Sequence, residues 1–113
     1  MFNRLKSELS ASALIRRAEG AGAFATVVRR GDPDAGALHV VVRTLDGAAR
    51  LYSPIRDMSG KAAWLEGAAE NERELDAKLA RMHGRDPDLW VVEVSDRAGR
   101  HFLVEPVERT PRT

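Results

Sequence analysis

The sequence predicts an α+β fold, in which an antiparallel sheet of about five strands carries two helices on one face, in the order α-β-β-β-α-β-β. Two segments place apolar residues at helical spacing, and several short runs rich in β-branched residues are bounded by turn residues. Most of these runs are joined by connections short enough for hairpins, and no strand–helix–strand crossover is evident. Neighbouring strands joined in this way run antiparallel.

A first helix is predicted from Ser7 to about Gly20. The Ser7 hydroxyl can accept a hydrogen bond from the free backbone N–H groups of the first turn, an effect worth about 1 kcal/mol. Gly20 or Gly22 can end the helix, because glycine adopts the left-handed conformation without strain. One face of this helix is apolar and consists of Ala11, Leu14, Ile15 and Ala18.

Two strands are predicted at residues 23–28 and 37–42, on either side of a charged connection. The connection contains two glycines and an Asp-Pro pair, which are typical of tight turns, so it predicts a hairpin. Its sequence is Arg29-Arg30-Gly31-Asp32-Pro33-Asp34-Ala35-Gly36. A two-residue turn at Asp46-Gly47, with both residues at positive φ, is then predicted to lead into a third strand at 48–52.

Residues 53–69 form the longest irregular connection that the sequence predicts. Pro54 cannot donate to a strand ladder, and Gly60 and Gly67 loosen the backbone. Such a loop in a small domain is either functional or partly disordered. In an alternative interpretation, Trp64 covers one end of the core.

A second helix is predicted to begin after Asn71, which can form a capping box with Glu74. Gly84 can end this helix. Its apolar stripe consists of Leu75, Leu79 and Met82.

The strongest strand pattern follows at residues 89–94. A turn at 96–99 is predicted to lead into a final antiparallel strand at 100–104. Residues 106–113 are expected to form a frayed tail.

The composition limits the classes of function. With 113 residues and no cysteine, the chain is expected to form one domain over residues 1–113, without disulfides, a thiolate metal site or a cysteine nucleophile. Residues 1–8 lack the apolar segment of a signal sequence, and no apolar run is long enough to span a membrane. We therefore expect a cytoplasmic protein that does not bind a membrane.

Five arginines form a candidate surface for an anion or an acidic partner. A planar guanidinium binds phosphate and carboxylate groups through paired hydrogen bonds. If these arginines converge, they form a binding patch, which Arg43 and Arg100 can join from neighbouring strands; if they are dispersed, they are solvated charges that contribute little. The five residues are Arg16, Arg17, Arg29, Arg30 and Arg85.

Two Asp-Pro-Asp corners carry the candidate metal ligands, Asp32 and Asp34 in the first corner and Asp86 and Asp88 in the second. Carboxylates that project from a corner can bind Mg²⁺ through one or two oxygens, with a neighbouring arginine on a substrate phosphate. The alternative is the ordinary role of aspartate in turns, where the carboxylate accepts hydrogen bonds from nearby backbone N–H groups. The structural role is the favoured one.

Other catalytic patterns are missing from the sequence. His39, His83 and His101 lie far apart and lack the spacing of a zinc-binding motif. No serine lies in a nucleophile elbow. The sequence therefore predicts no catalytic residue and no cofactor.

Four blocks of the chain resemble a family of short bacterial proteins known only as a domain of unknown function. They are Val-Val-Arg-Arg-Gly-Asp-Pro-Asp-Ala-Gly at 27–36, Leu-Asp-Gly at 45–47, Arg-Asp-Pro-Asp-Leu-Trp-Val-Val-Glu-Val at 85–94 and Asp-Arg-Ala-Gly-Arg-His-Phe-Leu at 96–103. The resemblance covers nearly the whole chain. It implies a stand-alone domain of about this size and carries over no catalytic residue, cofactor or partner.

Two functions remain open at this point. The favoured one is a small non-catalytic binding or interaction module that uses the arginine-rich surface to bind a protein partner or a second copy of the chain. Nucleic acid is a less favoured partner, because the net charge is only +1. The alternative is a small metal-assisted enzyme that acts on a phosphorylated substrate through the Asp-Pro-Asp corners.

Overall fold

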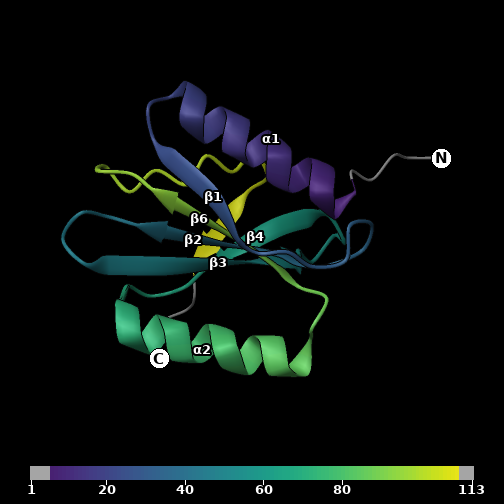
Figure 1. Cartoon of the computed structure of the whole chain (residues 1–113). Coiled ribbons are helices and arrows are strands. Elements are labelled where there is room, and N and C mark those ends of the chain that lie inside the picture. Colours follow the sequence, from purple (N-terminus) through teal and green to yellow (C-terminus); the bar gives the residue numbers. More distant parts are fainter. Residues whose placement is uncertain (1–5, 110–113) are drawn as a thin grey trace.

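One sheet lies between two helices in the computed structural model, which describes residues 6–109 (Figure 1). The helices are α1 (Ser7–Gly20) and α2 (Glu72–Arg85). The strands are β1 (Phe24–Arg29), β2 (Leu38–Arg43), β3 (Ala48–Arg56), β4 (Ala62–Glu66), β5 (Glu70–Asn71), β6 (Trp90–Ser95) and β7 (Val107–Arg109).

The strands form a single seven-stranded mixed sheet in the order β1-β6-β2-β3-β4-β7, with β5 paired to β3. β6 runs parallel to β2 and β7 runs parallel to β4, whereas the other pairs are antiparallel. The α+β class and the two helices are confirmed. The prediction of an antiparallel sheet of about five strands is wrong, because two parallel pairs and two further short strands are present.

The predicted hairpin between β1 and β2 is also wrong, because β6 lies between them. On β6, Trp90, Val92 and Val94 are buried on one face and Val91 on the other. A strand that is apolar on both faces belongs in the interior of a sheet. The glycine-rich connection instead arches over the start of β6, where the Trp90 N–H donates to the Ala37 carbonyl at 2.8 Å.

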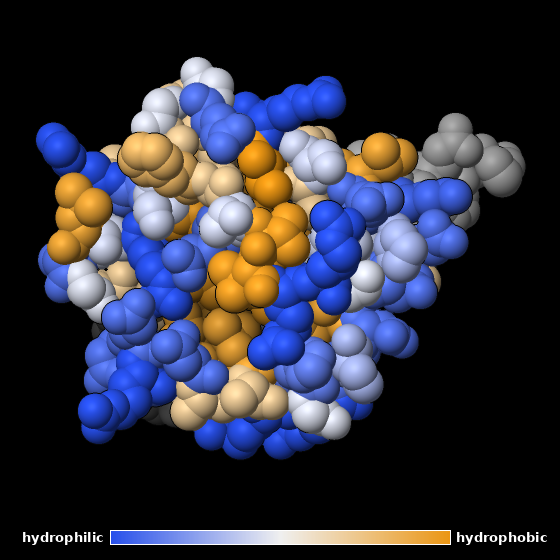
Figure 2. All heavy atoms as spheres, in the orientation of Figure 1, coloured by the Kyte–Doolittle hydropathy of each residue, from blue (hydrophilic) through white to orange (hydrophobic). Residues whose placement is uncertain are grey.

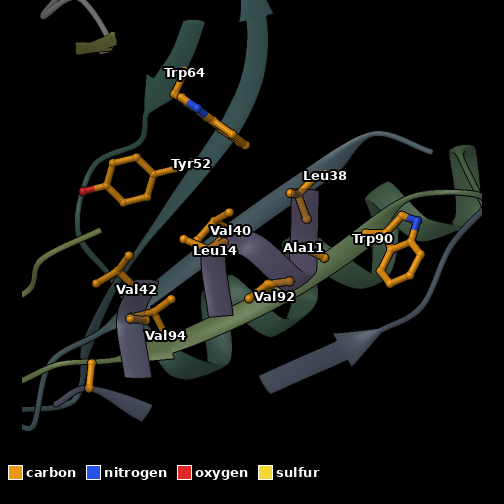
Figure 3. Close-up of a cluster of buried hydrophobic side chains, with 12 residues drawn as sticks. Ala11, Leu14, Leu38, Val40, Val42, Tyr52, Trp64, Trp90, Val92 and Val94 are labelled. Atoms are coloured by element: carbon orange, nitrogen blue, oxygen red, sulfur yellow. The ribbon is translucent and has the colours of Figure 1, made fainter. Parts of the chain in front are cut away.

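The helices cover opposite faces of the sheet, which corrects the prediction that both pack on one face (Figure 1). Beneath α1, Leu14 packs among Val40 and Val92 in the larger core, part of which Figure 3 shows. Beneath α2, Leu75 packs in a smaller core with Val41. The physical reason is that consecutive valines of β2 point to opposite faces, and each face needs its own cover.

The region predicted as irregular forms the hairpin β3–β4, closed by residues 57–61. Pro54 lies opposite Trp64 in the β3–β4 pair. The two residues exchange no backbone hydrogen bond there, because the Trp64 N–H points away from β3 and donates to the Pro106 carbonyl at 2.8 Å. The Pro54 nitrogen therefore faces the other side, and there β2 pairs with β3 only as far as Tyr52. Proline at this position removes no ladder hydrogen bond.

The predicted final strand at 100–104 is absent, because residues 101–104 cross the α1 face of the sheet without strand pairing. Phe102 is the one non-glycine residue within 6–109 that has positive φ, at 61°. The segment from residue 106, which was expected to fray, contributes β7 at the sheet edge beside β4. Residues 110–113 lie outside the described part of the chain.

Local predictions agree better with the structure than long-range ones. Asn71 and Glu74 form the predicted capping box at the start of α2. A hairpin does join β2 to β3, although its connection spans residues 44–47 and only Gly47 there has positive φ. The Ser7 hydroxyl does not cap α1 but donates to the Gly36 carbonyl, so it fastens α1 to the connection before β2.

Neither helix in the described part of the chain has the length and apolar character needed to cross a membrane.

Substitution of Gly31 by alanine tests the packing of the arching connection against β6. A Cβ at Gly31 would overlap the Asp88 carbonyl oxygen, so backbone must move, and we expect the free energy of unfolding to fall by about 2–4 kcal/mol. Gly84→Ala is the matched control, because a Cβ at Gly84 would meet no atom within 4 Å and its φ is not positive. Urea unfolding measures both, and equal stability of the two variants would contradict the close approach.

Candidate binding groove

An open groove lies beside α1, because this helix packs on β1, β6 and β2 and leaves the β3–β4 hairpin uncovered on that face. The groove has a volume of about 490 Å³, within the range of ligand-binding pockets. The segment 103–105 forms its far wall. A smaller hollow of about 70 Å³ lies near the turn between β2 and β3, among Thr44, Ala48 and Gly99.

The groove is mainly apolar. α1 contributes one stripe, with Ser7 at its start, Leu14 in the middle and Arg17 near its end. The other α1 residues of the lining, Ser10 and Ala13, have small side chains. The remaining apolar lining consists of Ala35, Ala37, Leu38, Pro54, Ile55, Ala62, Ala63, Trp64, Leu103 and Val104.

Trp64 links the groove to the larger core. Its side chain is 8% exposed, and Figure 3 shows it with Tyr52 at the border of the packed cluster. Its indole N–H donates to Glu105 Oε1 at 3.0 Å, which ties the floor of the groove to the far wall. The sequence-based interpretation of Trp64 as a cover for one end of the core agrees with this position.

Two arginines of the groove have no carboxylate partner within residues 6–109. Arg17 Nε donates to the Phe102 carbonyl at 2.9 Å, and Arg56 Nη1 donates to the Gly60 carbonyl at 3.3 Å. Neither guanidinium takes part in an ion pair with another described residue. By contrast, Asp34 in the same lining pairs with Lys6 Nζ at 3.5 Å.

The far wall is anchored by the turn that follows β6. Asp96 is buried, and its carboxylate accepts from the backbone N–H of Arg100 at 2.8 Å and from the guanidinium at 2.8 and 3.1 Å. The hydrogen bonds from Arg100 lower the pKa of the Asp96 carboxyl to about 2. The Arg100 guanidinium also lies 4.9 Å from the centre of the Phe102 ring, so the turn and the wall are held together.

The two Asp-Pro-Asp corners meet at the start of β6. The Asp32 N–H donates to the Asp88 carbonyl at 2.9 Å, and the Trp90 indole N–H donates to the Asp32 carbonyl at 2.7 Å. The Arg30 guanidinium lies 5.1 Å from the centre of the Trp90 ring and pairs with Glu8 at 3.0 Å. The corners thus form one joint of the fold.

Two carboxylates of this joint accept hydrogen bonds from backbone N–H groups within their own turns. Asp32 Oδ2 accepts from the N–H groups of Asp34 and Ala35 at 3.1 and 2.8 Å, and Asp86 Oδ1 accepts from the Asp88 N–H at 3.1 Å. Within residues 6–109, no group of three or more histidine, aspartate or glutamate side chains is placed to hold a metal ion. The metal hypothesis therefore gains no ligand set from the structure.

The sheet separates His101 from the other two histidines. His39 Nδ1 lies 3.3 Å from Ser53 Oγ, and burial lowers the pKa of His39. His101 packs on the α1 face against the Tyr52 ring at 5.3 Å, and its Nδ1 accepts from the Leu103 N–H. His83 lies near the end of α2.

The five arginines singled out from the sequence do not form one cluster. Arg30 lies beside Glu8 at the start of α1, whereas Arg17 is about 13 Å further along the same helix. Arg16 is exposed near Arg17, Arg29 ends β1, and Arg85 ends α2 just before the joint. Only Arg17 lines the groove.

Comparison with known proteins agrees with the sequence blocks described above. The sequence model of a family described as a protein of unknown function, DUF1491, matches residues 5–104. The chain belongs to the DUF1491 family. The predicted resemblance to a bacterial family of unknown function is thereby confirmed, and among curated proteins no match to the chain was found.

Solved structures of similar proteins share the fold. A crystal structure of a DUF1491 family protein from Caulobacter crescentus CB15 is 48% identical, with a TM-score of 0.87 over 93% of this chain and 100% of that chain. An NMR structure of a DUF1491 family protein from the same organism is 47% identical, with a TM-score of 0.84 over 95% and 99% of the two chains. A solution structure of a protein from A. tumefaciens is 35% identical, with a TM-score of 0.75 over 98% and 100%.

Sequence reasoning did not identify Arg56 or the segment 103–105 as parts of a site. Arg56 follows Pro54 at the end of a strand that was predicted to stop at residue 52. The signal that could have found the groove is the α1 stripe, in which small residues and Arg17 recur on one helical face.

Replacement of Asp96 by asparagine tests the anchor of the far wall. Because the folded-state pKa of Asp96 is lowered from 3.8 to about 2, its carboxylate stabilises the fold above about pH 4, and that contribution is lost as the pH falls toward 2. We expect Asp96→Asn to lower the urea midpoint at pH 7 and the difference from wild type to shrink steadily below pH 4.

Glu19→Gln is a control for this prediction, because Glu19 is exposed near the end of α1 and takes no part in the turn that holds the wall, so the urea midpoint should stay close to that of wild type at each pH. The proposed role of the carboxylate would be contradicted if the urea midpoints of wild type and Asp96→Asn differed by the same amount at about pH 7 and pH 2.

Proposed function

We propose that the protein is a non-catalytic binding module whose groove beside α1 receives an extended apolar segment of a partner protein with acidic side chains at its ends. The observation that carries this proposal is an open apolar groove bordered by Arg17 and Arg56, neither of which is neutralised by a described carboxylate. The apolar lining supplies the affinity and the arginines supply the orientation of the bound segment.

Apolar side chains at the groove remain open to a ligand. Val104 on the far wall is 67% exposed, and Pro54 on the hairpin is also exposed. Burial of such surface favours a complex, and the part of this free energy that exceeds the cost of association and ordering appears as affinity. The groove therefore offers both an apolar floor, at Leu14 and Trp64, and uncovered apolar rims.

The charges favour an acidic partner. Of the two negative side chains of the lining, Asp34 pairs with Lys6, whereas Glu105 accepts from the Trp64 indole, which carries no charge. The lining thus has one negative and two positive side chains without an oppositely charged partner among the described residues. The two positive ones donate only to backbone carbonyls within the described chain. A carboxylate on the partner can form paired hydrogen bonds with either guanidinium.

The length of the groove fits an extended peptide. Ser7 and Arg17 line it from ten residues apart on α1, which corresponds to about 15 Å. An extended chain advances about 3.3 Å per residue, so about five residues span this distance.

The lining also favours binding over catalysis. Its serines, Ser7 and Ser10, have no histidine beside them in the described lining, and the Ser7 hydroxyl donates to the Gly36 carbonyl. A serine without a neighbouring base is a weak nucleophile. The positive φ of Phe102, whose carbonyl accepts from Arg17, is the kind of backbone strain that occurs at ligand sites.

The test uses two capped five-residue peptides with the same three leucine or valine residues in the middle, one with glutamate ends and one with lysine ends. Titration of ¹⁵N-labelled protein is expected to shift amide resonances along α1 and the β3–β4 hairpin. We expect the glutamate peptide to bind about fivefold more tightly, since each exposed ion pair contributes up to about 1 kcal/mol. The double variant Arg17→Glu and Arg56→Glu should reverse this preference.

Arg16→Glu is the matched control, because Arg16 is exposed on the same helix but does not line the groove. It should leave the preference for the glutamate peptide unchanged. Equal binding of the two peptides, or resonance shifts confined to the joint at the start of β6, would refute the groove as the binding surface.

A further inference from the structure

The first strand of the sheet has a free edge. Within residues 6–109, β1 pairs only with β6 and lies at the end of the strand order. A free edge presents unpaired N–H and C=O groups to any other strand, and proteins usually protect it with charges, proline or a bulge. β1 has one charged residue, Arg29, and its irregularity lies between Val27 and Arg29, so residues 24–27 carry none of these protections.

β1 also exposes apolar side chains on the face that α2 leaves open. Phe24 is 79% exposed and Val28 is 56% exposed, and they alternate with Ala25 and Val27, which pack under α1. α2 packs on β3 and β5 and does not reach β1. Figure 2 shows apolar side chains gathered between the two helices, with hydrophilic side chains on both flanks.

We infer that β1 pairs antiparallel with β1 of a second copy of this chain, across a twofold axis at Thr26. In this register the two Thr26 residues face each other, and each Phe24 lies opposite the Val28 of the other copy, where the irregularity of β1 ends the regular part of the strand. Aromatic residues paired across strands with β-branched ones stabilise antiparallel sheets. The two free edges satisfy each other, and the sheet continues through the dimer.

The charges of the β1 edge permit pairing with a second copy. Residues 24–28 carry no charge, and Arg29, the one charged residue of β1, lies beyond the paired stretch. Two copies can therefore approach without like charges facing each other across the new strand pair. The charged ends of α2 play no part, because α2 packs on β3 and β5, away from this edge.

The size of the contact predicts a reversible dimer. β1 has six residues and spans about 20 Å, so the interface is smaller than the roughly 1,200 Å² typical of stable complexes. We expect dissociation in the micromolar range or weaker, so that monomer and dimer exchange with protein concentration. This inference does not depend on the function proposed for the groove, because neither Phe24 nor Val28 lines the groove.

Sedimentation equilibrium over a series of protein concentrations tests the dimer. Wild type should show a concentration-dependent monomer–dimer equilibrium, and Phe24→Glu should weaken it about tenfold or more. Leu45→Glu is the matched control, because Leu45 is an apolar side chain that is 72% exposed in the turn between β2 and β3. A monomer at every concentration, or equal weakening by both variants, would overturn the inference.

A cysteine at Thr26 tests the register directly, because the chain has no cysteine of its own. Under mild oxidation Thr26→Cys should form a disulfide-linked dimer, whereas Leu45→Cys should remain largely monomeric under the same conditions. Failure of Thr26→Cys to cross-link more than Leu45→Cys would overturn the pairing at Thr26. Binding of the glutamate peptide to Phe24→Glu should be unchanged, which separates the outcome for the dimer from the outcome for the groove.

Discussion

The contact on which the fold depends is the one between the connection after β1 and the backbone that leads into β6. Gly31 and Gly36 allow this connection to approach the Asp88 carbonyl so closely that a Cβ on either would overlap that oxygen. The Trp90 indole closes the contact by donating to the Asp32 carbonyl. Because the connection passes over the start of β6, this strand is held between β1 and β2, and the sheet becomes mixed.

The position of β6 also decides which surfaces remain free. Six strands side by side span about 24 Å, whereas a helix with its side chains is about 10 Å wide, so one helix cannot cover a face of the sheet. α1 covers β1, β6 and β2 on one face, and α2 packs on β3 and β5 on the other. The groove over β3–β4 and the apolar edge at β1 are therefore at opposite ends and on opposite faces of the sheet.

Most charged groups of the molecule serve the fold. Asp32 and Asp86 accept from backbone groups in their own turns, and Asp96 anchors the segment that walls the groove. Arg43 is shared among three carboxylates, from α2 and β6. In the groove, Arg17 and Arg56 have no carboxylate partner among the described residues, and they carry the proposal of an acidic partner in a family whose function is unknown.

The sequence by itself determined the local elements: both helices, the capping box at Asn71, the strand character of β2 and β6, and the family. These features depend on residues close together in the chain, through hydrogen-bond geometry and side-chain periodicity. Only the tertiary structure decided that β6 lies between β1 and β2, that the helices lie on opposite faces, and that Arg17 and Arg56 line the same groove. Such pairings depend on which apolar faces are buried against each other. The valines of β2 could pack beside any apolar strand, and the close approach of Gly31 to the Asp88 carbonyl places β6 there.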